Sequence, residues 1–136
     1  MLSTVFDAYR TTIVCLGLAG GLLVFQLLVV DVAGIRRRHP PGLPIEPDPT
    51  DFLFRATRAH ANTNESIAAF TLLAIFSVAV GADAAWTNGL AATWIVGRVA
   101  HMACYYAGWG PARSASFGLS LIALLGLFVN GMRALF

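Results

Sequence analysis

The chain has 136 residues, of which 57% are hydrophobic and only 12% charged, and its mean hydropathy is +0.71. Soluble domains carry about 25% charged residues, so this composition excludes an ordinary soluble protein and predicts an all-helical integral membrane protein. The net charge of +2 is too small to indicate a nucleic-acid partner. The length suits one domain over residues 1–136. All nine basic residues are arginine and none is lysine, and Ala and Gly are frequent, which is typical of a GC-rich bacterial genome.

The first apolar segment, residues 13–30, is long enough to span a bilayer core. Gly17 and Gly21 form a small-xxx-small step that allows another helix to approach closely. The Arg36–Arg38 cluster and a proline-rich loop follow, and a basic cluster beside a spanning helix marks the cytoplasmic side. Because the basic residues follow the apolar run, we expect no cleaved signal peptide. The arginines either signal topology alone or also bind an anionic ligand.

Three further helices are predicted, over residues 51–80, about 86–106 and 113–135. The turn at 81–84 lacks a basic residue, as expected on the non-cytoplasmic side, and the Gly-Trp-Gly-Pro sequence at 108–111 should break the chain between the last two helices. The sequence therefore predicts four transmembrane helices, with both termini on the non-cytoplasmic side and both charged loops in the cytoplasm.

A polar stripe enters the second predicted helix. Arg55, Arg58, Asn62 and Glu65 recur at intervals of three and four residues, which places them on one helix face. A carboxylate inside a bilayer is costly unless it is paired or lines a cavity. The stripe is therefore a candidate functional site.

A matching stripe lies on the third predicted helix, where Arg98, His101 and Tyr105 also recur at intervals of three and four. Counting outward from the intervening turn brings the two stripes to the same depth. The predicted pairs are Glu65 with Arg98, Asn62 with His101, and Arg58 with Tyr105. This pattern indicates either a buried ion pair that fixes helix register, or a site for a small anionic ligand that carries carboxylates and an ammonium group.

Two motifs, Arg-x-x-Arg-Ala-His-x-Asn-x-x-Glu at 55–65 and Gly-Arg-Val-Ala-His-x-x-x-Tyr at 97–105, resemble the MAPEG family. This family comprises membrane-associated proteins in eicosanoid and glutathione metabolism, among them the microsomal glutathione transferases and the microsomal prostaglandin E synthase. The resemblance implies a four-helix bundle assembled as a homotrimer, with glutathione bound between protomers near the cytoplasmic side.

The resemblance also implies roles for single residues. The residues that would contact glutathione are Arg37, Arg58, His60, Asn62, Glu65, Arg98, His101 and Tyr105. His60 and an arginine of the Arg36–Arg38 cluster would come from the neighbouring protomer. Arg113 matches the family's catalytic arginine, whose guanidinium stabilises the glutathione thiolate; a nearby cation lowers a thiol pKa and makes the sulfur nucleophilic.

The function predicted from this resemblance is that of a detoxifying membrane glutathione transferase, with its active site facing the bacterial cytoplasm and a lipophilic electrophile, peroxide or lipid as its second substrate. The alternatives are a non-catalytic member that binds lipid or glutathione, and a small transporter that uses the Glu65–Arg98 stripe. His60, His101 and Cys104 lack compact ligand spacing, so no metal site is predicted. Cys15 and Cys104 are expected to be free thiols.

Overall fold

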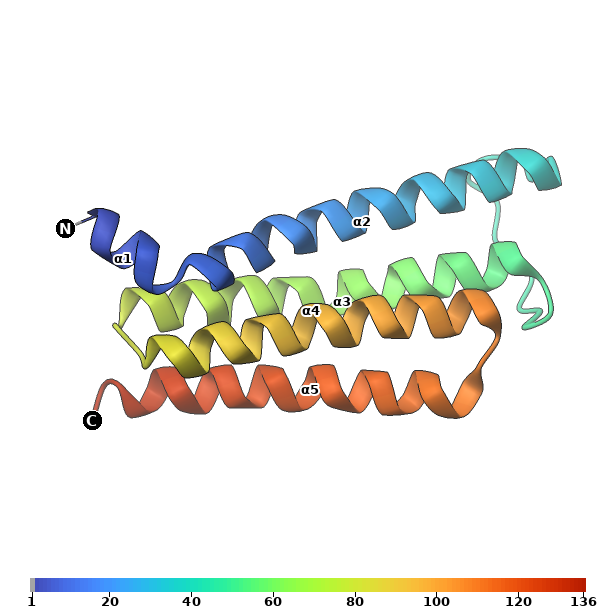
Figure 1. Ribbon diagram of the computed structural model, residues 1–136. Helices are drawn as coiled ribbons and strands as arrows, with labels where there is room; N and C mark the ends of the chain where they lie inside the picture. Colours follow the sequence, from blue (N-terminus) through green and yellow to red (C-terminus); the bar gives the residue numbers. More distant parts are fainter. Residues whose placement is uncertain (1) are drawn as a thin grey trace.

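The computed structural model describes residues 2–136, and all the regular secondary structure in these residues is helical. A short helix, α1 (Leu2–Ala8), precedes four long ones: α2 (Arg10–Arg37), α3 (Phe52–Ala79), α4 (Ala84–Ala107) and α5 (Gly110–Arg133). The four long helices lie side by side (Figure 1), with both termini at one end of the bundle and the loops at 38–51 and 108–109 at the other. The predicted all-helical class and the four main helices are therefore confirmed.

The first long helix extends well beyond the predicted residues 13–30. It begins at Arg10, one residue after α1, and ends at Arg37, so part of the basic cluster forms its last turn rather than following it. Hydropathy falls at Asp31, but no helix-breaking residue occurs before Pro40. Hydropathy marks the apolar part of a helix, whereas the backbone remains helical until a breaker or a cap, and here Arg38 caps it in the left-handed conformation with a φ of 53°.

The remaining helix ends follow local sequence signals. Asp51 accepts a hydrogen bond from the Leu53 amide and caps α3, and Gly108 ends α4 with a φ of 75°. The predicted break at 108–111 is too long, because α5 begins at Gly110 rather than at Arg113. Proline in the first turn of a helix loses no hydrogen bond, so Pro111 starts α5 instead of interrupting the chain.

Small side chains let the helices pack closely around an aromatic pair. Phe70 of α3 stacks on Trp94 of α4, with ring centroids 4.0 Å apart, and both side chains are fully buried. A Cβ atom at Gly97 of α4 would lie 2.3 Å from Ser120 Oγ of α5, so this crossing requires glycine. The sequence predicts such a crossing at Gly17 and Gly21 as well, but apart from the adjoining backbone of α2 no atom of the described residues lies within 4 Å of a Cβ atom built at either position.

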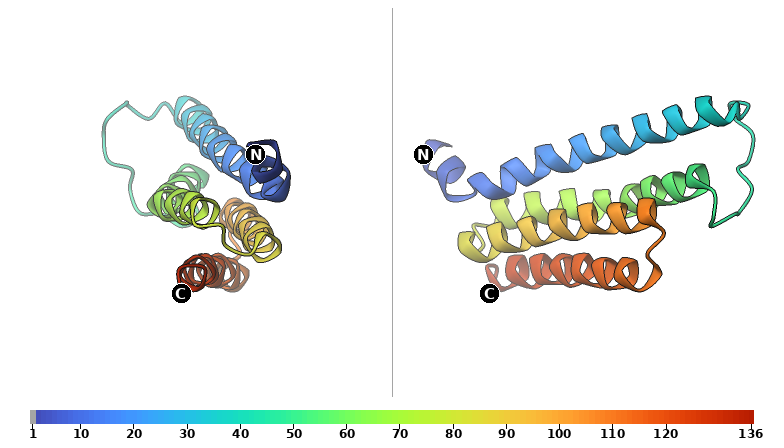
Figure 2. Two further views of the ribbon diagram at one scale, coloured as in Figure 1. Left: turned by 90° about the vertical axis from the view of Figure 1, so that its left-hand side faces the viewer. Right: turned by 45° about the vertical axis from the view of Figure 1, so that its right-hand side comes forward.

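Helix α2 is fixed to the rest of the bundle at the end that carries the termini. The Tyr9 hydroxyl donates to the Ala82 carbonyl, and the Thr12 amide and hydroxyl donate to Asn88 Oδ1 at 3.0 and 2.8 Å. Toward its other end α2 diverges from α3 and α4 (Figure 2). The long loop then bridges from α2 back to α3, and the ion pair of Arg37 with Asp51, at 3.0 Å, closes it.

Two of the described helices, α2 and α5, are long and apolar enough to cross a membrane. Helices α3 and α4 have comparable lengths, 28 and 24 residues, but carry the polar stripes. Large apolar side chains are exposed along the bundle, for example Leu72 on α3 and Ile122 on α5, at 69% and 66%. An exposed surface of this kind suits contact with lipid or with another protein rather than with water.

Candidate functional site

A cavity of about 220 Å³ opens at the loop end of the bundle, between α3, α4 and the start of α5. Its lining residues are Pro49, Phe54, Arg55, Arg58, Cys104, Tyr105, Gly108 and Arg113. The cavity thus brings together three of the residues that the sequence assigned to the site: Arg58, Tyr105 and Arg113. Arg58 and Tyr105, which the sequence predicts to lie at the same depth, both line this cavity.

The short turn between α4 and α5 brings Arg113 close to Tyr105. Tyr105 lies in the last turn of α4, Gly108 reverses the chain, and Arg113 follows in the first turn of α5. The guanidinium carbon of Arg113 lies 4.7 Å from the centroid of the Tyr105 ring, which is a cation–π contact. This contact holds a guanidinium at the cavity wall.

Arg55 supplies a further guanidinium and connects the loop to α4. Its Nη1 donates to the carbonyls of Pro49 and Thr50 at 3.0 and 2.8 Å, and its Nη2 donates to the Tyr106 carbonyl at 3.4 Å. With Arg58 and Arg113, three guanidinium groups line the cavity, and none of its lining residues in the described chain is acidic. This arrangement favours a ligand with negative charge.

A second group of polar side chains lies deeper between α3 and α4. Arg98 is only 1% exposed, and its Nη1 donates to Asn62 Oδ1 at 2.7 Å and to the Asn62 carbonyl at 3.4 Å. Its guanidinium carbon lies 5.3 Å from the centroid of the Phe117 ring. A charge-assisted hydrogen bond and an aromatic face therefore stabilise this buried charge.

His101 lies between the two groups. Its ring is buried and meets the Tyr105 ring edge to face, with centroids 5.0 Å apart. His101 Nδ1 and Arg98 Nε have no hydrogen-bond partner among the described residues. Buried polar atoms of this kind are normally satisfied, so water or a ligand is expected to reach them.

The predicted ion pair between Glu65 and Arg98 is wrong for a single protomer. Arg98 donates a hydrogen bond to Asn62, and Glu65 forms no ion pair within residues 2–136. Counting from the turn gives the depth of a residue but not its direction around the helix axis. Asn62 faces α4, whereas Glu65 is exposed on the outer surface of α3. The register interpretation based on this pair therefore has no support inside one protomer.

Arg37 and His60 are also outside the arginine-lined cavity. Arg37 pairs with Asp51 and lines a separate hollow formed by the 38–51 loop. The hydrogen bond from Arg37, followed by that from the Leu53 amide, lowers the pKa of the Asp51 carboxyl. His60 is half-buried on α3, and its Nδ1 has no partner among the described residues.

Among the lining residues that the sequence did not assign to the site, two carry a charged or reactive group: Arg55 and Cys104. Arg55 was placed on the polar stripe but was not assigned to the ligand site, although its position three residues before Arg58 signals a common face. For Cys104 the sequence predicts a free thiol and gives no place in the site. It is a free, buried cysteine that borders the cavity beside Tyr105, and its place on α4 became clear only with the fold.

These features define an all-helical bundle with two helices of membrane-spanning length and a basic cavity at its loop end. In a comparison with known protein families, residues 11–132 match the MAPEG family. The chain belongs to the MAPEG family, a family of membrane-associated, glutathione-related proteins that are mostly glutathione-dependent enzymes. This result confirms the resemblance seen in the two sequence motifs and the membrane fold that it implied.

Proposed function

We propose that the protein is a membrane glutathione transferase that binds glutathione in the arginine-lined cavity and directs its thiolate at a lipophilic electrophile. The proposal rests on the charge of the residues that line the cavity. Arg55, Arg58 and Arg113 line a single cavity with Tyr105, and no acidic side chain accompanies them there within the described chain. Glutathione is a small peptide with carboxylates at its ends and a thiol between them, so it suits a cavity of this charge.

The cavity residues have distinct chemical roles in this proposal. Guanidinium groups form bidentate hydrogen bonds with carboxylates, so Arg55 and Arg58 would hold the ends of the peptide. Arg113, held against the Tyr105 ring, would lower the thiol pKa. The thiol then releases its proton to water, and the sulfur forms a bond with the electrophilic carbon or with a peroxide oxygen as the leaving group departs.

The exposed charges on α3 support assembly with neighbouring protomers, for which the family resemblance implies a homotrimer. Glu65 lies near the middle of this 28-residue helix, and both Glu65 and Arg58 are exposed in the protomer. A charged side chain at the centre of a lipid-facing helix costs about 2.5–3.5 kcal/mol, so a neighbouring protomer should cover this face. Ligand pockets usually measure about 300 Å³ or more, and a neighbour that contributes His60 and Arg37 would enlarge the cavity of about 220 Å³.

The distribution of arginine supports a cavity that faces the cytoplasm, in a bacterial inner membrane. The loop end of the bundle carries six arginines outside its buried interior, at 36–38, 55, 58 and 113, against Arg10 and Arg133 at the other end. A cysteine introduced at Pro44 should react with an impermeant thiol reagent only from the cytoplasmic side. Labelling from the outside would reverse the proposed orientation.

Glutathione binding to an Arg58→Ala variant tests the site. Loss of a charge-assisted hydrogen bond to a bound ligand costs about 1.5–3 kcal/mol, which corresponds to a tenfold to hundredfold rise in Kd. Calorimetric titration of the purified assembly measures this rise, and Arg10→Ala, at the opposite end of the bundle, provides the matched control. An intact Arg58→Ala assembly with unchanged affinity would contradict the site, and tight binding without conjugation would contradict the enzymatic role.

A further inference from the structure

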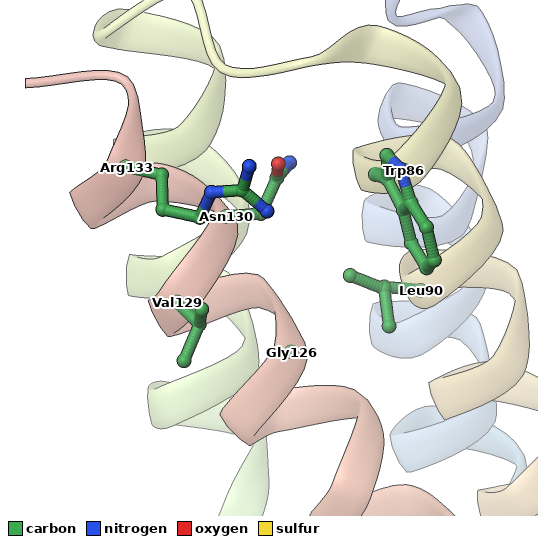
Figure 3. A pocket seen from close by; sticks show the side chains of 6 residues that line it. All are labelled: Trp86, Leu90, Gly126, Val129, Asn130 and Arg133. Atoms are coloured by element: carbon green, nitrogen blue, oxygen red, sulfur yellow. The ribbon is translucent and has the colours of Figure 1, made fainter.

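A second cavity system lies at the opposite end of the bundle, remote from the arginine-lined cavity. An apolar groove of about 170 Å³ runs between α4 and α5, and its lining residues are Trp86, Leu90, Gly126, Val129, Asn130 and Arg133. Figure 3 shows Trp86 and Leu90 on α4 at one side of this groove, and Gly126, Val129 and Asn130 on α5 at the other. A Cβ atom at Gly126 would lie 2.6 Å from a Leu90 methyl carbon, so glycine lets the two helices close the groove floor.

The groove continues into a polar hollow at the helix ends. This hollow shares Trp86, Asn130 and Arg133 with the groove and adds Gly81, Asp83 and Ala134. One side of the combined space is therefore apolar, and its end toward the aqueous phase carries a guanidinium, a carboxylate and an amide. Exposed tryptophan is typical of the membrane–water interface, and Trp86 is 67% exposed.

The polar groups at the mouth retain bonding capacity. Arg133, in the last turn of α5, forms no ion pair with any acidic side chain of the described chain. The Nδ2 group of Asn130 donates to the Asp83 carbonyl at 3.2 Å and to Thr87 Oγ1 at 3.0 Å, which leaves its side-chain oxygen as an acceptor. One carboxylate oxygen of Asp83 accepts from the Trp86 amide, and the other is not used in this cap.

We propose that this space binds a phospholipid with a phosphoethanolamine headgroup. The Arg133 guanidinium donates to the phosphate, Asp83 and Asn130 accept hydrogen bonds from the ammonium group, and an acyl chain lies in the groove along Leu90 and Val129. The neighbouring opposite charges of Arg133 and Asp83 favour a zwitterionic headgroup with an N–H donor. A purely anionic headgroup would face the Asp83 carboxylate, and a choline group has no N–H to donate.

A second apolar hollow on α4 gives room for the other acyl chain. It is formed by Ala85, Trp86, Gly89, Leu90 and Thr93, so it shares Trp86 and Leu90 with the groove. These two side chains form a ridge with an apolar hollow on either side. A ligand with two chains and one zwitterionic head fits this arrangement better than a single-chain detergent.

Native mass spectrometry of the purified, delipidated assembly tests the proposal. The probes are dioleoyl lipids with phosphoethanolamine, phosphocholine or phosphoglycerol heads, offered at equal concentration. The phosphoethanolamine lipid should be retained in preference to both others. Arg133→Gln should reduce its retention roughly tenfold, as expected when one charge-assisted hydrogen bond to the phosphate is lost. Asp83→Asn keeps a residue suited to cap α4 but should abolish the preference over the phosphoglycerol lipid.

Arg10→Gln provides the matched control, because Arg10 is also exposed at this end of the bundle but does not line the groove. Its lipid retention should equal that of the parent protein, and glutathione binding should be unchanged in all three variants. Equal retention of the three lipids by the parent, or an equal loss in Arg10→Gln and Arg133→Gln, would overturn the proposal. Should Asp83→Asn fail to assemble, the comparison of Arg133→Gln with Arg10→Gln decides the matter.

Discussion

The hydrogen bond between Asn62 and Arg98 should make a measurable contribution to stability. In an Asn62→Ala variant the Arg98 guanidinium, 1% exposed, loses its partner at 2.7 Å. Hydrogen bonds to charged groups contribute about 1.5–3 kcal/mol. The Asn62 carbonyl, at 3.4 Å, and the Phe117 ring remain near the guanidinium, so we expect a loss of about 2 kcal/mol in the free energy of unfolding.

Reversible unfolding of the purified protein in mixed micelles measures this loss. Asn64→Ala is the matched control, because Asn64 lies on the same helix but is exposed, and its replacement should change stability by less than about 0.5 kcal/mol. In an Arg98→Met background, Asn62→Ala should cost less than it does in the parent, because the charge that needed the amide is gone. Equal losses in the two backgrounds, or no loss in the parent, would refute the assignment of Asn62 as the partner of Arg98.

Two further predictions concern packing and the loop. Gly97→Ala should lower the free energy of unfolding by about 1–3 kcal/mol, because its Cβ would lie 2.3 Å from a serine oxygen of α5. Gly89→Ala has open space around it and should raise the free energy of unfolding by about 0.5–1 kcal/mol. Equal effects of the two substitutions in thermal unfolding would contradict this packing. Arg37 lowers the pKa of Asp51, so their ion pair should persist from pH 7 to 5 and be lost as the pH falls below about 4, through the lowered pKa of the folded state. A nitroxide label at Pro44 of the parent protein should therefore become mobile only in that acidic range. In Asp51→Asn the same label should be mobile at every pH. A parent loop that is already mobile at pH 7 would disprove that the ion pair closes the 38–51 loop.

The sequence predicted the helices because their signals are local. The caps of α3 and α4, at Asp51 and Gly108, occupy the positions that side-chain and backbone chemistry require. The error at the end of α2 arose because hydropathy measures lipid preference, whereas helix termination depends on backbone breakers such as Pro40. Helix bounds are thus predictable where a cap or a breaker defines them.

The candidate site was predicted in composition but only in part in geometry. Helical periodicity placed Arg58 and Tyr105 at a common depth, and both line one cavity. The same counting joined Glu65 to Arg98, because depth along a hairpin does not determine which face of α3 meets α4. The proximity of Arg113 to Tyr105 depends on how the chain reverses at Gly108, which no spacing within a helix determines.

Ionisation of bound glutathione is the sharpest test of whether Arg113 stabilises the thiolate. A thiolate absorbs at about 240 nm and a thiol does not, so difference spectra at several pH values report the pKa of the bound thiol, which is about 8.5 when unperturbed. The parent protein and Arg10→Ala should ionise bound glutathione at pH 7. Arg113→Ala should still bind glutathione, but it should show thiolate only at higher pH, with turnover reduced in parallel. If Arg113→Ala and the parent ionise bound glutathione alike, Arg113 does not stabilise the thiolate, and its proposed catalytic role is wrong.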